Sequence, residues 1–178
     1  MKGIVFTEFL EMVEVKFGYA MVDKIITDAN LPSNGSYTSI GTYPHQEMVS
    51  LVTQLHQKTQ IDVETLLKTF GSHLFDVFKK SYSFFFDNHS TSFDFLESIE
   101  NHIHVEVKKL YPEAELPKFE TKRVSDKSMI MTYYSDRKMA ALAEGLIAST
   151  LAHFNEAGTI ETKKLDSERK IVTFLIQI

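Results

Sequence analysis

The chain has 178 residues, of which 43% are hydrophobic, a net charge of -5 at pH 7 and no cysteine. This length and apolar content fit one domain with a core large enough to enclose a ligand. The acidic balance argues against nucleic-acid binding, and the lack of cysteine excludes disulfides, thiolate metal ligands and cysteine nucleophiles.

The first 60 residues predict three helices and the loop between two of them. Met1-Lys2-Gly3 leads directly into a helical apolar pattern that reaches Phe17, where Gly18 predicts a stop. A second short helix covers 21–26, a Ser/Gly/Pro/Asn-rich loop spans 30–41, and Tyr43-Pro44 opens a third helix. No signal peptide or membrane-length apolar run is present, so we expect a soluble, cytoplasmic protein that does not bind membranes.

Two further helices follow. Asp62 is a candidate N-cap, with Thr65 at the capping-box position, for a helix whose broad apolar coverage predicts burial on more than one side. After an aromatic run, Ser92 is expected to cap a single helix that carries His102 and His104. At about 100° per residue, these two histidines flank the apolar stripe on opposite sides, so periodicity does not say which one faces a pocket.

After Tyr111-Pro112 the pattern changes from helical to extended. Strands are predicted at 118–123 and 128–134, a helix at 137–154, and a closing hairpin at 159–165 and 170–178. This order predicts an α+β fold, in which an N-terminal helical lobe precedes a lobe of mostly antiparallel sheet with packing helices. We expect one domain over residues 1–178, with a lobe boundary at about residue 60.

Two polar features could carry chemistry. Tyr133, Ser135 and Arg137 share one face if the chain is extended, and two hydroxyls with a guanidinium suit a pair of carboxylates or a phosphate. A strand end with surface polar groups explains the same spacing. A lone histidine beside an apolar stripe is more often structural than a ligand. No nucleophile elbow or glycine-rich phosphate loop is present, so we do not expect an enzyme.

Taken together, these residues resemble the H-NOX, or haem-NO-binding, family, which occurs in bacteria and in the sensor region of soluble guanylate cyclase. The resemblance runs through MKGIVFTEFLEMVEVKFG, IHVEVKKLYPEAELP, YYSDRKM and EGLI. It includes an intact YxSxR signature at Tyr133, Ser135 and Arg137. The resemblance covers the chain essentially from end to end.

The resemblance implies a haem b cofactor with His104, seven residues before Tyr111, as the axial iron ligand and His102 as a neighbour only. Tyr133, Ser135 and Arg137 would clamp the propionates, and Pro117 would press on the porphyrin and keep it non-planar. Six positions match the apolar lining of the pocket: Val5, Phe9, Leu74, Phe78, Leu142 and Leu146.

The implied function is a bacterial sensor that binds NO, and also CO, at ferrous haem. NO would weaken the bond between His104 and iron, and the N-terminal lobe would shift relative to the sheet lobe. The signal would pass to a separate histidine kinase or a cyclic-di-GMP synthase or phosphodiesterase. Oxygen-binding members carry a tyrosine where this chain has Leu142. An oxygen-binding haem protein of the same fold and a haem-free ligand- or protein-binding module remain alternatives.

Overall fold

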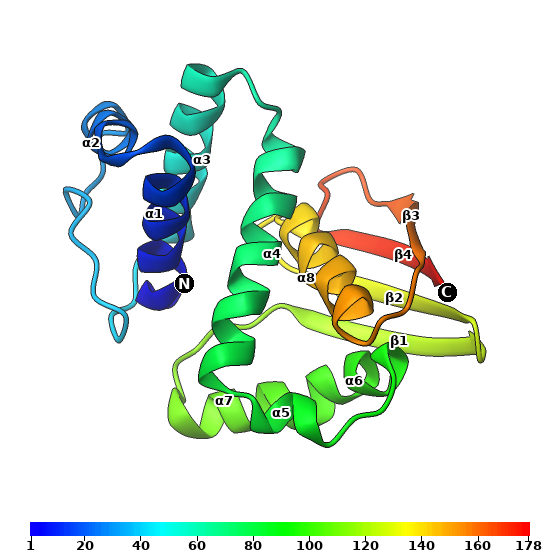
Figure 1. Ribbon diagram of the computed structural model, residues 1–178. Helices are drawn as coiled ribbons and strands as arrows, with labels where there is room; N and C mark the ends of the chain where they lie inside the picture. The colour runs from blue at the N-terminus through cyan, green and yellow to red at the C-terminus, as the bar shows by residue number, and fades with distance from the viewer.

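The computed structural model describes residues 1–178 and has the predicted α+β architecture (Figure 1). Helices α1 (Gly3–Phe17), α2 (Tyr19–Asp28) and α3 (His45–Thr59) gather on one side of the long helix α4 (Val63–Ser81). Gly18 ends α1 as predicted: its φ of 83° favours glycine, and its N–H donates to the carbonyl of Glu14. These helices share an apolar core with the first half of α4.

Helix α4 is the central element of the fold. It starts as predicted, with the Asp62 side chain accepting a hydrogen bond of 2.9 Å from the Thr65 N–H. It contacts α1 and α3 on one side and α8 (Ala140–His153) on the other, which explains its broad apolar coverage. Gly71 and Gly145 lie where α4 and α8 cross, because a Cβ at Gly145 would meet the Lys68 carbonyl oxygen at 2.2 Å. The two backbones therefore pack without side chains between them.

The helix that carries His104 differs from the expectation of a single helix capped by Ser92. After the short helix α5 (Phe84–Asp87), α6 (Ser92–Ser98) is capped by Thr91, whose side chain accepts from the Asp94 N–H. A π-helical turn (Ile99–Ile103) follows, and α7 (His104–Leu110) begins at the histidine itself. The backbone N–H of His104 donates to the carbonyl of Ile99, five residues back, so the helix is locally wider there.

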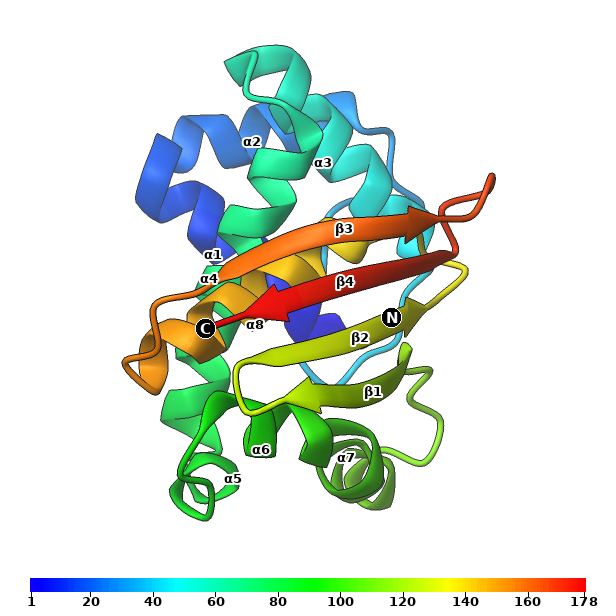
Figure 2. The same ribbon diagram turned by 90° about the vertical axis from the view of Figure 1, so that its right-hand side faces the viewer.

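Four antiparallel strands form a single sheet in the order β1-β2-β4-β3 (Figure 2). They are β1 (Lys118–Ser125), β2 (Ser128–Tyr134), β3 (Thr159–Leu165) and β4 (Ile171–Gln177). Alternate residues of β2 and β4 are buried in one core cluster with α8 residues, so α8 covers one face of the sheet. In the register of the first pair, Phe119 stands opposite Tyr133.

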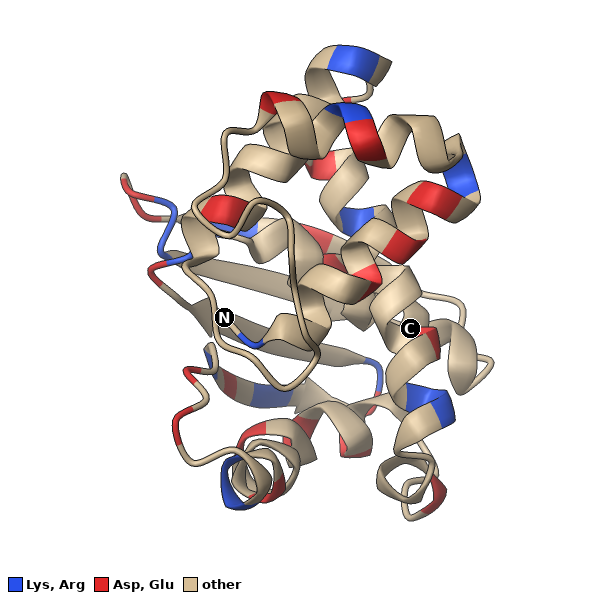
Figure 3. Cartoon of the chain, turned by 90° about the vertical axis from the view of Figure 1, so that its left-hand side faces the viewer, with Lys and Arg blue, Asp and Glu red and all other residues tan.

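Helix α8 begins at Ala140, three residues later than the predicted start at Arg137. Lys138 has a φ of 58°, which a right-handed helix cannot include, and its N–H donates to the Ser135 carbonyl in a turn. Arg137 therefore lies on a turn between β2 and α8. No helix of the chain combines the length and the apolar character that a membrane crossing needs. Acidic and basic residues are interspersed over the side formed by α1–α3 (Figure 3).

Candidate functional site

His104 occupies the first position of α7 and faces the sheet. Its side chain is only 14% exposed, and its ring centroid lies 5.9 Å from that of Phe119 on β1. Burial lowers the pKa of His104, an effect that the carboxylate of Glu100 opposes. The imidazole is therefore neutral at pH 7, which is the form that ligates metals. His102 is exposed, and its ring stands edge-on to Phe85 instead, so the structure separates the two histidines as periodicity could not.

Glu100 and Phe119 belong to the surroundings of His104 although sequence reasoning missed them. Glu100 Oε2 lies 3.2 Å from His104 Nδ1 and accepts a hydrogen bond of 3.0 Å from the Phe119 N–H. The Phe119 ring contacts the rings of both His104 and Tyr133, with centroid distances of 5.9 Å and 5.7 Å. The spacing of four residues between Glu100 and His104 was a usable signal, since such pairs meet on a helix.

Tyr133, Ser135 and Arg137 come together through the turn and not through an extended strand. Only Tyr133 belongs to β2, while the Ser135 N–H donates to the Lys170 carbonyl and the Arg137 N–H donates to Ser135 Oγ. Tyr133 is 3% exposed, and its hydroxyl accepts a hydrogen bond of 3.2 Å from the Met139 N–H. Burial raises the pKa of Tyr133, so the phenol keeps its proton and can donate it.

Arg137 links this turn to the segment that follows the His104 helix. Its Nη2 donates to the backbone carbonyl of Glu115 and lies 3.7 Å from the Glu115 carboxylate. The Glu115 side chain is largely exposed, so water screens this ion pair. An open pocket with a volume of about 790 Å³ lies beside Ser135 and Arg137 and is also lined by His45, Leu116 and Lys118. Arg137 therefore borders an open space at the end of the turn.

The six apolar positions lie in one region, built from α1, α4 and α8. Phe9 and Leu74 are fully buried members of the helical core, and the other four pack against that core while only half-buried: Val5, Phe78, Leu142 and Leu146. Leu146 also packs against a second aromatic cluster that includes Phe75, Phe86 and Phe95. Half-buried apolar side chains next to a rigid core provide the kind of wall that a flat apolar ligand can cover.

The residues present suit a haem group by their chemistry. A neutral imidazole with Nδ1 bound to a carboxylate has Nε2 free to ligate, the turn offers a cationic and two hydroxyl donors, and apolar walls are available. Pro117 is half-buried in the segment immediately before β1, one residue from Lys118. No group of three or more His, Asp or Glu side chains converges as a metal-binding cluster.

Comparison with known proteins shows which family the chain belongs to. The profile of the haem-NO-binding family matches residues 2–162. The chain belongs to this family. Haem is thus the cofactor of the family, whose members include the H-NOX gas-binding proteins. A search of curated proteins found no match.

Solved H-NOX structures agree with the family assignment. The chain is similar to the unliganded Fe(II) H-NOX protein from K. algicida, with 45% identity and a TM-score of 0.95 over 99% of this chain and 96% of that one. It is 40% identical to the H-NOX from Shewanella woodyi in the Fe(II)CO state, with a TM-score of 0.83 over 99% and 94% of the chains. The H-NOX protein from S. oneidensis in the Fe(II)NO state shares the fold, with 24% identity, a TM-score of 0.90 and coverages of 99% and 98%.

Proposed function

We propose that this chain is a nitric-oxide sensor that binds ferrous haem b through His104 and signals to a separate protein. The observation that carries the proposal is that Phe119 contacts both a neutral, largely buried His104 and Tyr133 of the Tyr133/Ser135/Arg137 group. Haem, when bound, would supply an iron that can bind a diatomic gas. The family to which the chain belongs supports this reading.

The polar turn is proposed to hold the two propionates. Arg137 would exchange the screened Glu115 carboxylate for a propionate, while Tyr133 and Ser135 would donate from their hydroxyls. A guanidinium gives the stronger, charge-assisted bond because both partners are ionised. Pro117, which stands directly before β1, would press on the macrocycle with a ring that cannot move aside as a flexible side chain can.

The apolar wall is proposed to select NO and CO over oxygen. Bound oxygen carries partial negative charge and gains from a nearby hydrogen-bond donor, whereas NO and CO gain little. None of the six proposed lining residues has a donor: Val5, Phe9, Leu74, Phe78, Leu142 and Leu146. Tyr134 donates to Glu120 at 2.8 Å, so its hydroxyl is already engaged.

Signalling is proposed to follow from release of His104. A freed His104 would let α7 move, and the lobe of residues 1–60 would shift relative to the lobe of residues 61–178. A ligand can bias such a two-state change only through its different affinity for the two states. We propose a cytoplasmic histidine kinase or a cyclic-di-GMP synthase or phosphodiesterase as the receiver, with no catalysis by this chain.

An absorption spectrum of the ferrous protein in three gases tests the proposal. We expect a Soret band that shifts with NO and with CO, and no stable complex when the reductant is removed and air is admitted. A missing donor costs oxygen about 1.5–3 kcal/mol, or roughly ten- to a hundredfold in affinity.

Two results would contradict this function. A protein expressed with ample haem that shows no Soret band would support a haem-free binding module. A persistent oxygen complex in air would support an oxygen-binding protein, and it would mean that a residue outside the six positions supplies the donor.

A further inference from the structure

The π-helical turn places a carboxylate directly beside the proposed iron ligand. Glu100 lies in this turn, four residues before His104, and its Oε2 is 3.2 Å from His104 Nδ1. A carboxylate oxygen can only accept a hydrogen bond, so the proton between the two groups belongs to Nδ1. His104 is thereby held in the tautomer whose other nitrogen, Nε2, has a free lone pair.

The same oxygen also binds the sheet. Strand β1 is at the edge of the sheet, and the backbone N–H of its second residue, Phe119, donates to Glu100 Oε2 at 3.0 Å. An edge strand leaves such N–H groups without a strand partner, and Glu100 satisfies this one. One carboxylate oxygen therefore connects the ligand histidine to the strand that contacts Tyr133.

We propose that Glu100 is a positioning residue that sets the orientation and the ligand strength of His104, an inference that rests on the proposed haem function. A carboxylate that accepts from the distant nitrogen of a ligand histidine increases the basicity of that ligand. Glu100 thus strengthens the bond from His104 to iron and opposes its release. It also transmits any displacement of His104 to β1 through the Phe119 N–H.

Three substitutions separate the charge of Glu100 from its hydrogen bonds. Glu100→Gln keeps a neutral acceptor oxygen, whereas Glu100→Ala removes both contacts. Glu106→Gln makes the same chemical change six residues later, on α7, where Glu106 pairs with Lys109 at 2.6 Å and not with the histidine. It is therefore the matched control.

The readout is the iron–histidine stretching frequency in the resonance Raman spectrum of the unliganded ferrous protein. We expect the frequency to fall in Glu100→Gln, to fall further in Glu100→Ala and to stay unchanged in Glu106→Gln. The rate at which His104 is lost after NO addition should rise about tenfold in Glu100→Ala, the lower end of the effect of losing such a partner.

The possible failures are distinguishable. Equal stretching frequencies in the wild type and Glu100→Ala, both loaded with haem, would overturn this inference and leave the proposed function intact. An equal fall in Glu106→Gln would also overturn it, because the effect would then be a general one of negative charge near His104. A wild type that shows no haem at all would overturn the proposed function and this inference together.

Discussion

The two sides of the proposed haem site differ in how they are held. Helix α4, on the apolar side, buries six residues, whereas the π-turn and α7, on the histidine side, bury none. Val105 and Leu110 of α7 are 44% and 63% exposed. Segments with few buried apolar contacts open at the lowest free-energy cost. The difference indicates a rigid wall on the gas side and a ligand helix that can move.

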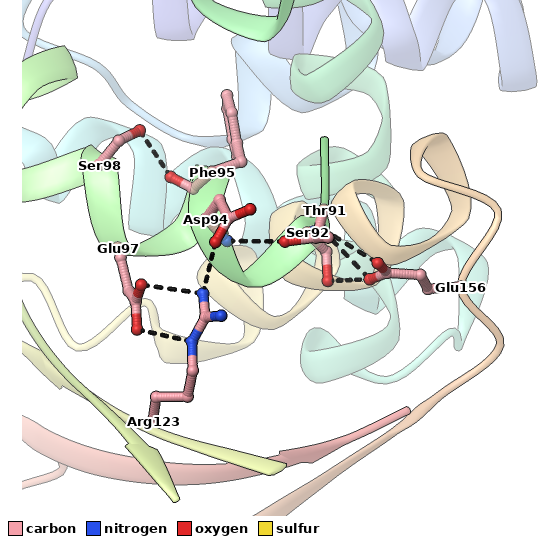
Figure 4. Close-up of polar contacts among 8 residues, drawn as sticks. All are labelled: Thr91, Ser92, Asp94, Phe95, Glu97, Ser98, Arg123 and Glu156. Atoms are coloured by element: carbon pink, nitrogen blue, oxygen red, sulfur yellow. Dashed lines mark hydrogen bonds and ion pairs between the residues drawn. The ribbon is translucent and has the colours of Figure 1, made fainter. Parts of the chain in front are cut away.

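The π-turn and α7 bury no residue, and polar contacts anchor the helical segment to which they belong. These polar contacts hold α6 more than α7. The Ser92 N–H and Oγ both donate to the carboxylate of Glu156, and Arg123 on β1 binds Asp94 and Glu97 (Figure 4). Within the π-turn, Glu100 ties the chain to the sheet through the Phe119 N–H. The π-turn is thus the junction between an anchored segment and a loosely held one.

The largest effect should come from the ligand itself. We expect His104→Gly to lose haem during purification unless imidazole is supplied, because His104 is the histidine whose ring packs against Phe119 of β1. His102→Ala, which alters an exposed neighbour, should retain haem. The Soret absorbance per protein measures both. Equal haem loss from the two variants would contradict the assignment of the ligand.

In the polar turn, we expect the charged donor to contribute more to haem binding than the neutral donors. Arg137→Ala should speed haem transfer to an apo-globin more than Ser135→Ala, since a charged donor contributes about 1.5–3 kcal/mol and a neutral one about 1 kcal/mol. Arg137→Ala also removes the partner of Glu115 in the haem-free protein, and this loss offsets part of the effect on haem binding. Faster haem transfer from the serine variant would show that Arg137 keeps Glu115 and does not bind a propionate.

A substitution at the close crossing of α4 and α8 tests how rigid the apolar wall is. A Cβ at Gly145 would lie 2.2 Å from the Lys68 carbonyl oxygen, and a backbone atom cannot rotate away. Gly145→Ala should lower the free energy of unfolding by up to about 2 kcal/mol, because an overpacking cost of about 1–3 kcal/mol is opposed by a helix-propensity gain of about 1 kcal/mol. Ser149→Ala on the same helix is the control. Denaturant unfolding that shows a stabilised Gly145→Ala protein would mean that α4 and α8 can separate at little cost.

Much of the fold follows from local patterns, and the exceptions have physical causes. The Asp62 cap, the stop at Gly18 and the strand at 128–134 were predicted because each depends on neighbouring residues only. The π-turn was not predicted, because it adds one residue to a helical turn without altering the apolar spacing enough to detect. The late start of α8 depends on the positive φ of Lys138, a residue type that gives no such signal.

In the candidate site too, features set by neighbouring residues were predictable, whereas those set by tertiary contacts were not. Patterns of three residues located the Tyr133/Ser135/Arg137 group, but the geometry that joins them is a turn and not an extended strand. Periodicity left His102 and His104 equivalent, the resemblance favoured His104, and the structure adds the burial of His104 and its contact with Phe119. Phe119 itself could not be found from the sequence, because its role depends on the pairing of β1 with β2.

We expect the smallest effect from removing the ion pairs of Arg123 that anchor α6 to β1. Arg123 donates to Asp94 at 2.7 Å and to Glu97 at 2.9 Å and 3.1 Å, and its guanidinium lies 5.7 Å from the Phe93 ring centroid. All three charged side chains are at least a third exposed, so the ion pairs are screened by water. Arg123→Gln should therefore cost only about 0.2–1 kcal/mol of unfolding free energy, and less in 1 M salt. The haem spectrum should not change, because the anchor lies before the π-turn.

The pH dependence of this small effect identifies its source. The hydrogen bond from Thr91 and then that from Arg123 lower the pKa of Asp94 below its ordinary value. A lowered folded-state pKa gives stability that is present above the unfolded pKa of about 3.9 and is lost as the pH falls through the folded value. The difference between wild type and Arg123→Gln should thus be full at pH 7 and shrink as the pH falls below about 4. Lys122→Gln, which removes a neighbouring charge on β1 that forms no ion pair, should show no such trend. A difference that persists in acid would assign the anchor to the contact of Arg123 with Phe93, and the histidine side would then depend on apolar packing after all.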